Sequence, residues 1–291
     1  VAAAAGLAAC GALVSWLDAA QHSLPFGLHK VDTWRIAFGV LALPGPVVAV
    51  LLVTMRLARA GPKPGDDIPA GGAGREISRI AFLPYLRANW LTVGAVSVGS
   101  GVIAIGAAVR LWAPVIAARV FHASPMEIGT GLGATGVIGW VAGLGITALI
   151  SRLYAARLGS RFSLRVLWVG AIASGAASFA MLTARSATTF FILLGVQAAI
   201  EAAGSIVSPG LLQDLGPAHL RSRLISFCVV VAMAINSIAP VLVGMLSDAL
   251  KPAPDGLLIA AVVVGVAGTG LSSLIFALSE TAYRRTADAL P

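Results

Sequence analysis

Four polar residues recur at helical spacing inside an otherwise apolar run between positions 188 and 211. They are Gln197, Glu201, Ser205 and Ser208, at i, i+4, i+8 and i+11. Helical geometry places such residues on one face, while the other faces carry Ala, Ile, Leu, Val and Gly. A carboxyl on this polar face could gain and lose a proton, and the amide and hydroxyls could line a cavity. The alternative is a neutral Glu201 that hydrogen-bonds to Gln197 and serves helix packing.

Two further polar positions lie inside apolar runs. Arg110 falls near the outer end of the run 90–117, one turn before Pro114, where it could bind an anion or extend toward a polar surface. Asn236 and Pro240 fall in the middle of the run 224–247. Because proline removes a backbone hydrogen bond, a kink or a tolerated proline is expected there.

The composition indicates the solvent in which these helices must lie. Of 291 residues, 58% are apolar and only 11% are charged, and the mean hydropathy is +0.93. Soluble domains carry about 25% charged residues, so a cytosolic enzyme, a disordered tail and a disulfide scaffold are excluded.

A membrane helix needs roughly 20 apolar residues. The apolar runs fall at 1–17, 34–55, 90–117, 126–150, 166–184, 188–211, 224–247 and 256–279. No alternation of period two competes with them, so we predict an all-α polytopic helix bundle with eight spans.

The distribution of basic residues predicts an orientation. Of the 20 Lys and Arg residues, 14 fall in one set of loops and 5 in the opposite set, with Arg110 inside a span. Cytoplasmic loops collect Lys and Arg, so the loop around 56–89 and the C-terminus are expected in the cytoplasm. The net charge of +8 is thus a topology signal, and no nucleic acid partner is expected.

Cofactor and metal patterns are not supported by their sequence context. Residues 131–136 read G-L-G-A-T-G, but a dinucleotide site needs a preceding strand and a βαβ unit. Small residues at three- and four-residue spacing (Gly129, Gly133, Gly136, Gly139 and Gly143) instead predict close helix packing in lipid. Cys10 and Cys228 lie in apolar runs, and no His spacing fits a metal site. We predict no cofactor and no metal.

Four stretches together resemble the major facilitator superfamily, and within it the spinster-like branch. They are TWRIAFGVLALPG (33–45), RLWAPVIAARVF (110–121), LLQDLGPAHLRSRLISF (211–227) and VLVGMLSDAL (241–250). The first is similar to the sixth helix of such a transporter, and the third to the loop after its tenth helix. The resemblance therefore implies three regions: the last two helices of the N-terminal bundle (1–57), a cytoplasmic linker (58–86) and a six-helix C-terminal bundle (87–291). The first four helices of the family are expected to be missing from this sequence.

The resemblance also implies a function. It indicates a secondary active transporter of the bacterial inner membrane that carries a small organic or amphipathic, lipid-like substrate by alternating access. Protons are the expected coupling ion, and this 291-residue piece is expected to be inactive alone. Glu201, Gln197, Ser205, Arg110 and Asn236 are the predicted substrate and coupling residues.

Gating residues are predicted in the cytoplasmic loops. Family members often combine an acidic residue with a basic cluster after the eighth helix; Arg152 is present here, but Ser151 stands where the acid is expected. Asp214 is expected to form an ion pair with Arg221 or Arg223.

Two alternatives from other classes remain. A membrane-embedded acyltransferase could use Asp214 and His219, which share a loop. A degenerate membrane protein could bind partners without transporting anything. Because no other catalytic motif accompanies the Asp214/His219 pair, we predict that the protein is not an enzyme.

Overall fold

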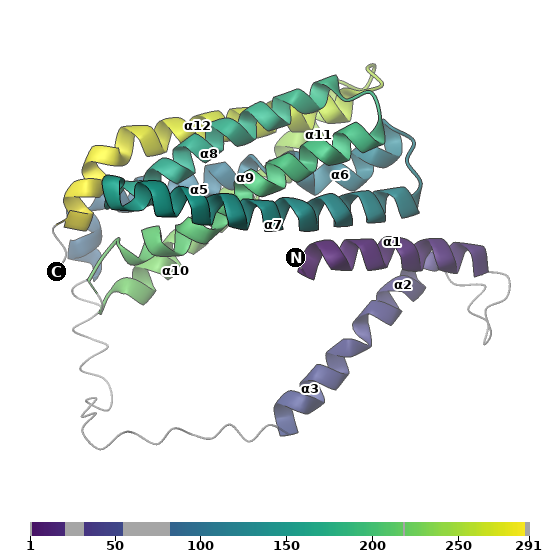
Figure 1. Ribbon diagram of the computed structural model, residues 1–291, viewed down its shortest axis with the longest axis horizontal. Helices are drawn as coiled ribbons and strands as arrows, with labels where there is room; N and C mark the ends of the chain where they lie inside the picture. The colour runs from purple at the N-terminus through teal and green to yellow at the C-terminus, as the bar shows by residue number, and fades with distance from the viewer. Residues whose placement is uncertain (1, 21–31, 55–81, 218, 289–291) are drawn as a thin grey trace.

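The computed structural model describes residues 2–20, 32–54, 82–217 and 219–288 (Figure 1). Every regular element within these ranges is a helix, as the sequence predicts. Six stretches are long and apolar enough to cross a membrane, and they run roughly parallel to one another in the bundle. They are Trp90–Arg119, Pro125–Leu158, Arg161–Thr183, Ala187–Gln213, Arg221–Ala249 and Gly256–Asp288.

Two of these six spans are broken near their middle. The first consists of α5 (Trp90–Ile105) and α6 (Ala108–Arg119), and the fifth consists of α10 (Arg221–Asn236) and α11 (Ala239–Ala249). The second break precedes Pro240, which lies at the start of α11, so of the two alternatives, a kink and a tolerated proline, the structure has the break. The first break has no proline at its position and was not predicted.

The other four spans are continuous helices. They are α7 (Pro125–Leu158), α8 (Arg161–Ala180, extended by the short η3, Met181–Thr183), α9 (Ala187–Gln213) and α12 (Gly256–Asp288). Ser124 begins α7 with a capping box, because its side chain accepts from the Glu127 amide and the Glu127 carboxylate accepts from the Ser124 amide. In the bundle, α7 packs against α9, α8 packs against both α9 and α12, and α5 packs against α10 and α12.

The first two apolar runs form shorter helices outside this six-helix unit. Helix α1 (Ala2–Ala20) packs along α7, whereas α2 (Thr33–Ala42) and α3 (Pro44–Thr54) extend away from the bundle (Figure 1). Neither run is among the six candidate spans, so the count of eight spans stays a prediction. Most of the predicted linker 58–86 lies outside the described residues.

Glycines allow α9 and α7 to approach closely, as the small-residue spacing predicts. A Cβ on Gly139 would lie 2.3 Å from the carbonyl oxygen of Gly195, and one on Gly143 would lie 2.3 Å from that of Ala199. The backbones are therefore in direct contact, which is how helices gain van der Waals packing in lipid. This contact fixes α9, the helix that carries Glu201.

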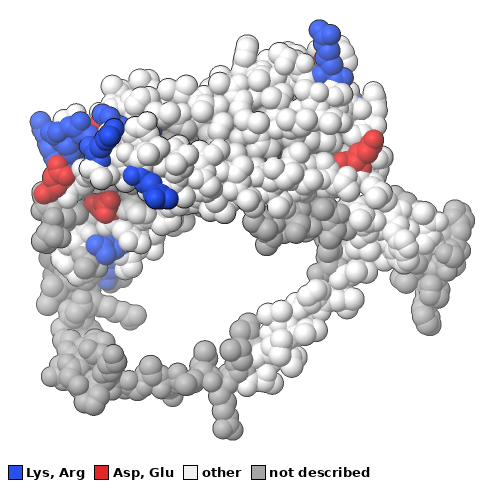
Figure 2. Space-filling view, in the orientation of Figure 1, with Lys and Arg blue, Asp and Glu red and all other residues white. Residues whose placement is uncertain are grey.

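Basic side chains gather at the end of the bundle where α12 ends and α10 begins (Figure 2). Arg165 of α8 donates from Nε and an Nη to the Glu280 carboxylate of α12, at 3.1 and 2.9 Å. Arg161 lies 3.8 Å from the same carboxylate oxygen. The long sides of the bundle in this view carry almost no charge. This distribution is what a membrane-spanning bundle requires.

A charged pair between two cavities

The larger described cavity lies among α6, α7, α9 and the break between α10 and α11. Its volume is about 880 Å³. Apolar side chains form most of its wall, including Leu111, Pro114, Leu132, Trp140 and Leu194. The polar groups that reach it are Arg110, Thr135, Glu201, Asn236 and Ser237. Such a lining can hold a molecule with a long apolar part and one charged or polar end.

Arg110 and Glu201 form an ion pair in this wall, although 91 residues separate them. Arg110 lies in the first turn of α6, and Glu201 lies near the middle of α9. Their side chains are 34% and 25% exposed, so the pair borders the cavity without being open to bulk solvent. A charge at this depth in a bilayer is costly when unpaired, and each residue of the pair offsets that cost for the other.

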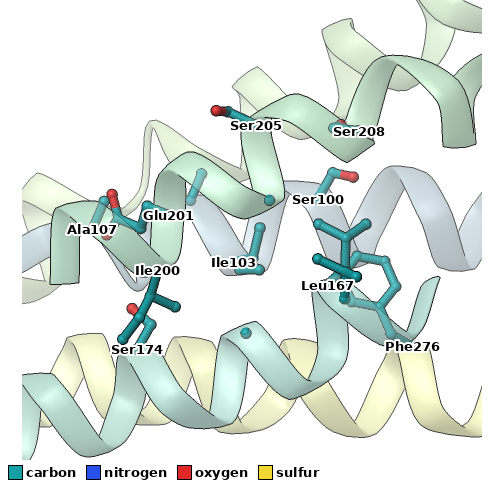
Figure 3. A pocket seen from close by; sticks show the side chains of 14 residues that line it. Ser100, Ile103, Ala107, Leu167, Ser174, Ile200, Glu201, Ser205, Ser208 and Phe276 are labelled. Carbon is teal, nitrogen blue, oxygen red and sulfur yellow. The ribbon is translucent and has the colours of Figure 1, made fainter. Parts of the chain in front are cut away.

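A second cavity of about 250 Å³ lies among α5, α8, α9 and α12 and also reaches Glu201 (Figure 3). Glu201, Ala104 and Ala107 border both cavities. Ser205 and Ser208 continue the polar face of α9 along the second cavity, as the helical spacing predicts. Glu201 therefore stands at the boundary between two spaces.

Gln197 is an exception to the predicted polar face. Its side chain is fully buried and borders neither cavity. Its amide nitrogen donates toward the Gly106 carbonyl oxygen and the hydroxyls of Ser174 and Ser178. The alternative in which a neutral Glu201 hydrogen-bonds to Gln197 is not observed, because Glu201 pairs with Arg110 and the Gln197 amide bonds to Gly106, Ser174 and Ser178.

The break between α10 and α11 brings Asn236, Ser237 and Pro240 to the larger cavity. Asn236 thus lines the same cavity as Arg110 and Glu201, and the shared role predicted for these residues stays a prediction. Trp140, Thr135 and Ser174 also line the cavities, and sequence reasoning did not select them. The one available signal was that Trp140 is the only tryptophan in the middle of a run.

The predicted gating residues lie at the basic end of the bundle. Asp214 accepts a hydrogen bond of 3.3 Å from the Tyr283 hydroxyl of α12. The neighbouring Leu215 carbonyl accepts one of 2.8 Å from Tyr85, and burial raises the pKa of that hydroxyl, which therefore stays protonated as a donor. These bonds tie the end of α9 to other elements.

The remaining predicted gating residues are Arg152, Arg221 and Arg223, and His219 belongs to the alternative acyltransferase site. Arg152 lies on an exposed face of α7, and Arg221 and Arg223 begin α10. Arg223 borders an open groove beside Phe82 and Phe227. No hydrogen bond joins Asp214 to the exposed His219 within the described residues, so the structure adds nothing to an acyltransferase site.

Comparison with known proteins gives a result for structure only. No protein family description and no curated protein sequence matches this chain. A crystal structure of a bacterial homologue of the human lysosomal transporter Spinster, inward-facing and occupied, is similar with a TM-score of 0.53 at 16% identity. That match covers 98% of this chain and 65% of the other. The unoccupied inward-facing form of the same homologue gives a TM-score of 0.49 at 16% identity, covering 96% of this chain and 66% of the other.

The chain is therefore a bundle of six helices that are long and apolar enough to cross a membrane, and its fold is similar to that of the bacterial Spinster homologue. More particularly, its fold is that of about two thirds of the bacterial Spinster homologue, which confirms the spinster-like resemblance found in the sequence. At this level of identity the similarity establishes the fold and leaves the activity to be argued from the site.

Proposed function

We propose that this chain is part of a secondary active transporter that moves a small organic or amphipathic substrate across a membrane by alternating access. The observation that carries the proposal is the Arg110–Glu201 ion pair, which lies between two cavities inside a bundle with a transporter fold. The regions 1–57, 58–86 and 87–291 are proposed as the end of a first bundle, a linker and a second bundle. The basic end of the bundle is proposed to face the cytoplasm of a bacterial cell.

The cavity wall supports the substrate class. A volume of about 880 Å³ lies within the range of ordinary small-molecule sites. The apolar part of a substrate could contact Leu111, Leu132 and Trp140. A negatively charged group could bind Arg110, and a positively charged group could bind Glu201. A single-chain amphiphile with a charged end matches this combination.

Proton coupling would act through the ion pair. Protonation of Glu201 removes its negative charge, so Arg110 loses its partner and becomes available to an anionic substrate group. Both broken spans border the larger cavity, through Arg110 of α6 and through Asn236 and Pro240. Discontinuous helices of this kind surround the midplane sites of many transporters, where one bundle moves against the other. The state of the pair could thus bias the position of α6 and α11.

Uptake into proteoliposomes tests the proposal. The full-length protein, including any native sequence before Val1, would be reconstituted, and uptake of a fluorescent single-chain amphiphile would be measured with and without an imposed pH gradient. We expect gradient-driven uptake in the native protein and loss of the gradient effect in Glu201→Gln. Asp248→Asn is the matched control, because Asp248 is an exposed carboxylate paired with Lys251 at a bundle end.

Two results would contradict the proposal. Gradient-driven uptake that is equal in Glu201→Gln and in the native protein would remove the coupling role of Glu201. A native protein without uptake for any charged amphiphile would leave the non-transporting membrane protein as the better account.

A further inference from the structure

Four helices are tied together at the basic end of the bundle. The Thr92 hydroxyl near the start of α5 lies 3.0 Å from the Thr286 hydroxyl near the end of α12. The start of α8 is bound to the last part of α12 through Arg165 and Glu280, and the end of α9 is bound there through Asp214. Because a helix rises about 1.5 Å per residue, the position of a residue in its helix gives its distance from the basic end.

The two cavities lie at different levels along the bundle and meet at Glu201. The larger cavity extends from Glu201 toward the end where α6 ends and α7 begins, since it reaches Pro114 and Leu132. The small cavity extends from Glu201 toward the basic end, since it reaches Val166 of α8 and Ser208 of α9. Val166 and Ser208 each lie about 8 Å from the basic end of their helix, whereas Glu201 lies about 18 Å from it.

The small cavity suits water better than it suits a substrate. Its volume of about 250 Å³ is below the range of about 300–1,000 Å³ that is usual for small-molecule sites. A water molecule occupies about 30 Å³ in the liquid and needs about two to four polar partners to stay in a cavity. The wall offers such partners in the Glu201 carboxylate and in the hydroxyls of Ser100, Ser174, Ser205 and Ser208 (Figure 3). Ser205 is exposed, so the cavity meets the surface of the described bundle in the half of α9 that is nearer the basic end.

Arg110 is the only other charged side chain on the described walls of the two cavities. The residues that α5, α8 and α12 contribute to the small cavity are all uncharged, and so are those that α7, α10 and α11 contribute to the larger one. Arg110 borders the larger cavity and not the small one. Glu201 therefore meets its counter-ion in one cavity and only neutral groups in the other.

We propose that the small cavity holds water and is the path by which Glu201 exchanges its proton with the solution at the basic end, while the larger cavity holds the substrate. The Glu201 carboxyl gives its proton to a water molecule in the small cavity, the proton passes on to the solution, and the carboxylate that remains pairs with Arg110. Uptake of a proton reverses these steps and frees Arg110 for an anionic group in the larger cavity. The use of the proton rests on the proposed transport function, whereas the water path itself does not.

Gly170 of α8 offers a position from which the small cavity can be probed. A Cβ added to Gly170 would have Ile200 Cγ2 as its nearest neighbour, at 3.9 Å, so a side chain there can enter the cavity without a clash. Val169 precedes Gly170 on the same helix, is 51% exposed and borders neither cavity. The two positions therefore have nearly the same depth in the bundle, and only one of them faces the cavity.

Thiol accessibility tests the water path without a transport assay. Gly170→Cys and Val169→Cys would each be made in the full-length protein after every native cysteine, including Cys10 and Cys228, is replaced by serine. Reaction with a small charged methanethiosulfonate would be measured in proteoliposomes from each side in turn, with a thiol scavenger on the other side. Digestion of a C-terminal tag identifies the side of the basic end, because α12 ends there.

The reactive thiolate forms in water and is disfavoured in apolar surroundings. We therefore expect Gly170→Cys to react from the basic end at least about tenfold faster than Val169→Cys. Equal rates at the two positions, or a faster reaction of Gly170→Cys from the opposite end, would overturn the path. Ser208→Cys reports on the same cavity from α9 if Gly170→Cys does not fold.

Filling the small cavity tests its use in transport. Gly170→Leu places an apolar side chain in the cavity and should abolish the effect of a pH gradient on uptake, while exchange of the amphiphile without a gradient is retained because the larger cavity is unchanged. Val169→Leu is the matched control outside both cavities. An unchanged gradient effect in Gly170→Leu would contradict the path. A reactive thiol in Gly170→Cys with no uptake by the native protein would remove the proposed function and leave the water path, and gradient-driven uptake with an unreactive thiol would do the reverse.

Discussion

Replacement of Gly143 by alanine should separate α7 from α9. The new Cβ would lie 2.3 Å from the Ala199 carbonyl oxygen and 2.7 Å from the Ala202 Cβ. Ordinary contact begins near 3.4 Å, so the two helices must move apart locally by about 1 Å. The atom that the new Cβ would meet belongs to the backbone of α9. A flexible side chain could rotate away, but the backbone of a helix cannot.

Two opposing effects determine how Gly143→Ala changes the free energy of unfolding. Overpacking of this kind costs about 1–3 kcal/mol, and alanine recovers roughly 0.5–1 kcal/mol through its better helix propensity. We therefore expect Gly143→Ala to lower the free energy of unfolding by up to about 2.5 kcal/mol. Gly145→Ala is the matched control on the same helix, because nothing lies within 4 Å of its Cβ position. It should be neutral or stabilising by up to about 1 kcal/mol.

Denaturant or thermal unfolding of the detergent-solubilised protein measures both variants. The informative quantity is the difference between them, since the chemical change is identical and only the surroundings differ. If Gly143→Ala and Gly145→Ala change stability equally, the close contact between α7 and α9 is incorrect, and with it the position of the helix that carries Glu201.

Two further predictions concern the ends of the bundle. Glu280→Gln removes the charge that Arg165 and Arg161 share and should cost about 1 kcal/mol at low salt, with a smaller loss at high salt; a loss independent of salt would contradict the ion pair. Ser124→Ala removes the N-cap of α7 and should lower stability by about 1 kcal/mol in unfolding experiments, whereas an unchanged stability would show that the capping box is not formed.

The long apolar spans could be predicted from the sequence because each needs only local information. The predicted run 188–211 corresponds to Ala187–Gln213, and the run 126–150 to Pro125–Leu158, which is longer at its C-terminal end by the segment 151–158. The contact at Gly139 and Gly143 followed from small-residue spacing alone. Helix period and bilayer thickness act over one segment, so one segment suffices to reveal them.

The pairing of Arg110 with Glu201 could not be predicted, because it depends on the arrangement of α6 against α9. Taken alone, Arg110 near a span end fits extension toward headgroups equally well. The break at Gly106 could not be predicted either, because no proline marks it and the close contact of α12 with Gly106 is tertiary. Gln197 shares a helix face with Glu201, yet only tertiary packing decides that one is buried and the other borders a cavity.

The central claim is that Arg110 and Glu201 act as one unit in the cavity wall. A double-mutant cycle with Arg110→Gln, Glu201→Gln and the combined variant measures this most directly, through unfolding free energies. Each single change leaves one partly buried charge without its partner, and the double change leaves none. Because the side chains are 34% and 25% exposed, the coupling should lie between surface and fully buried pairs, at about 1–3 kcal/mol. Effects that add to within about 0.3–0.5 kcal/mol would contradict the pair and the transport mechanism built on it.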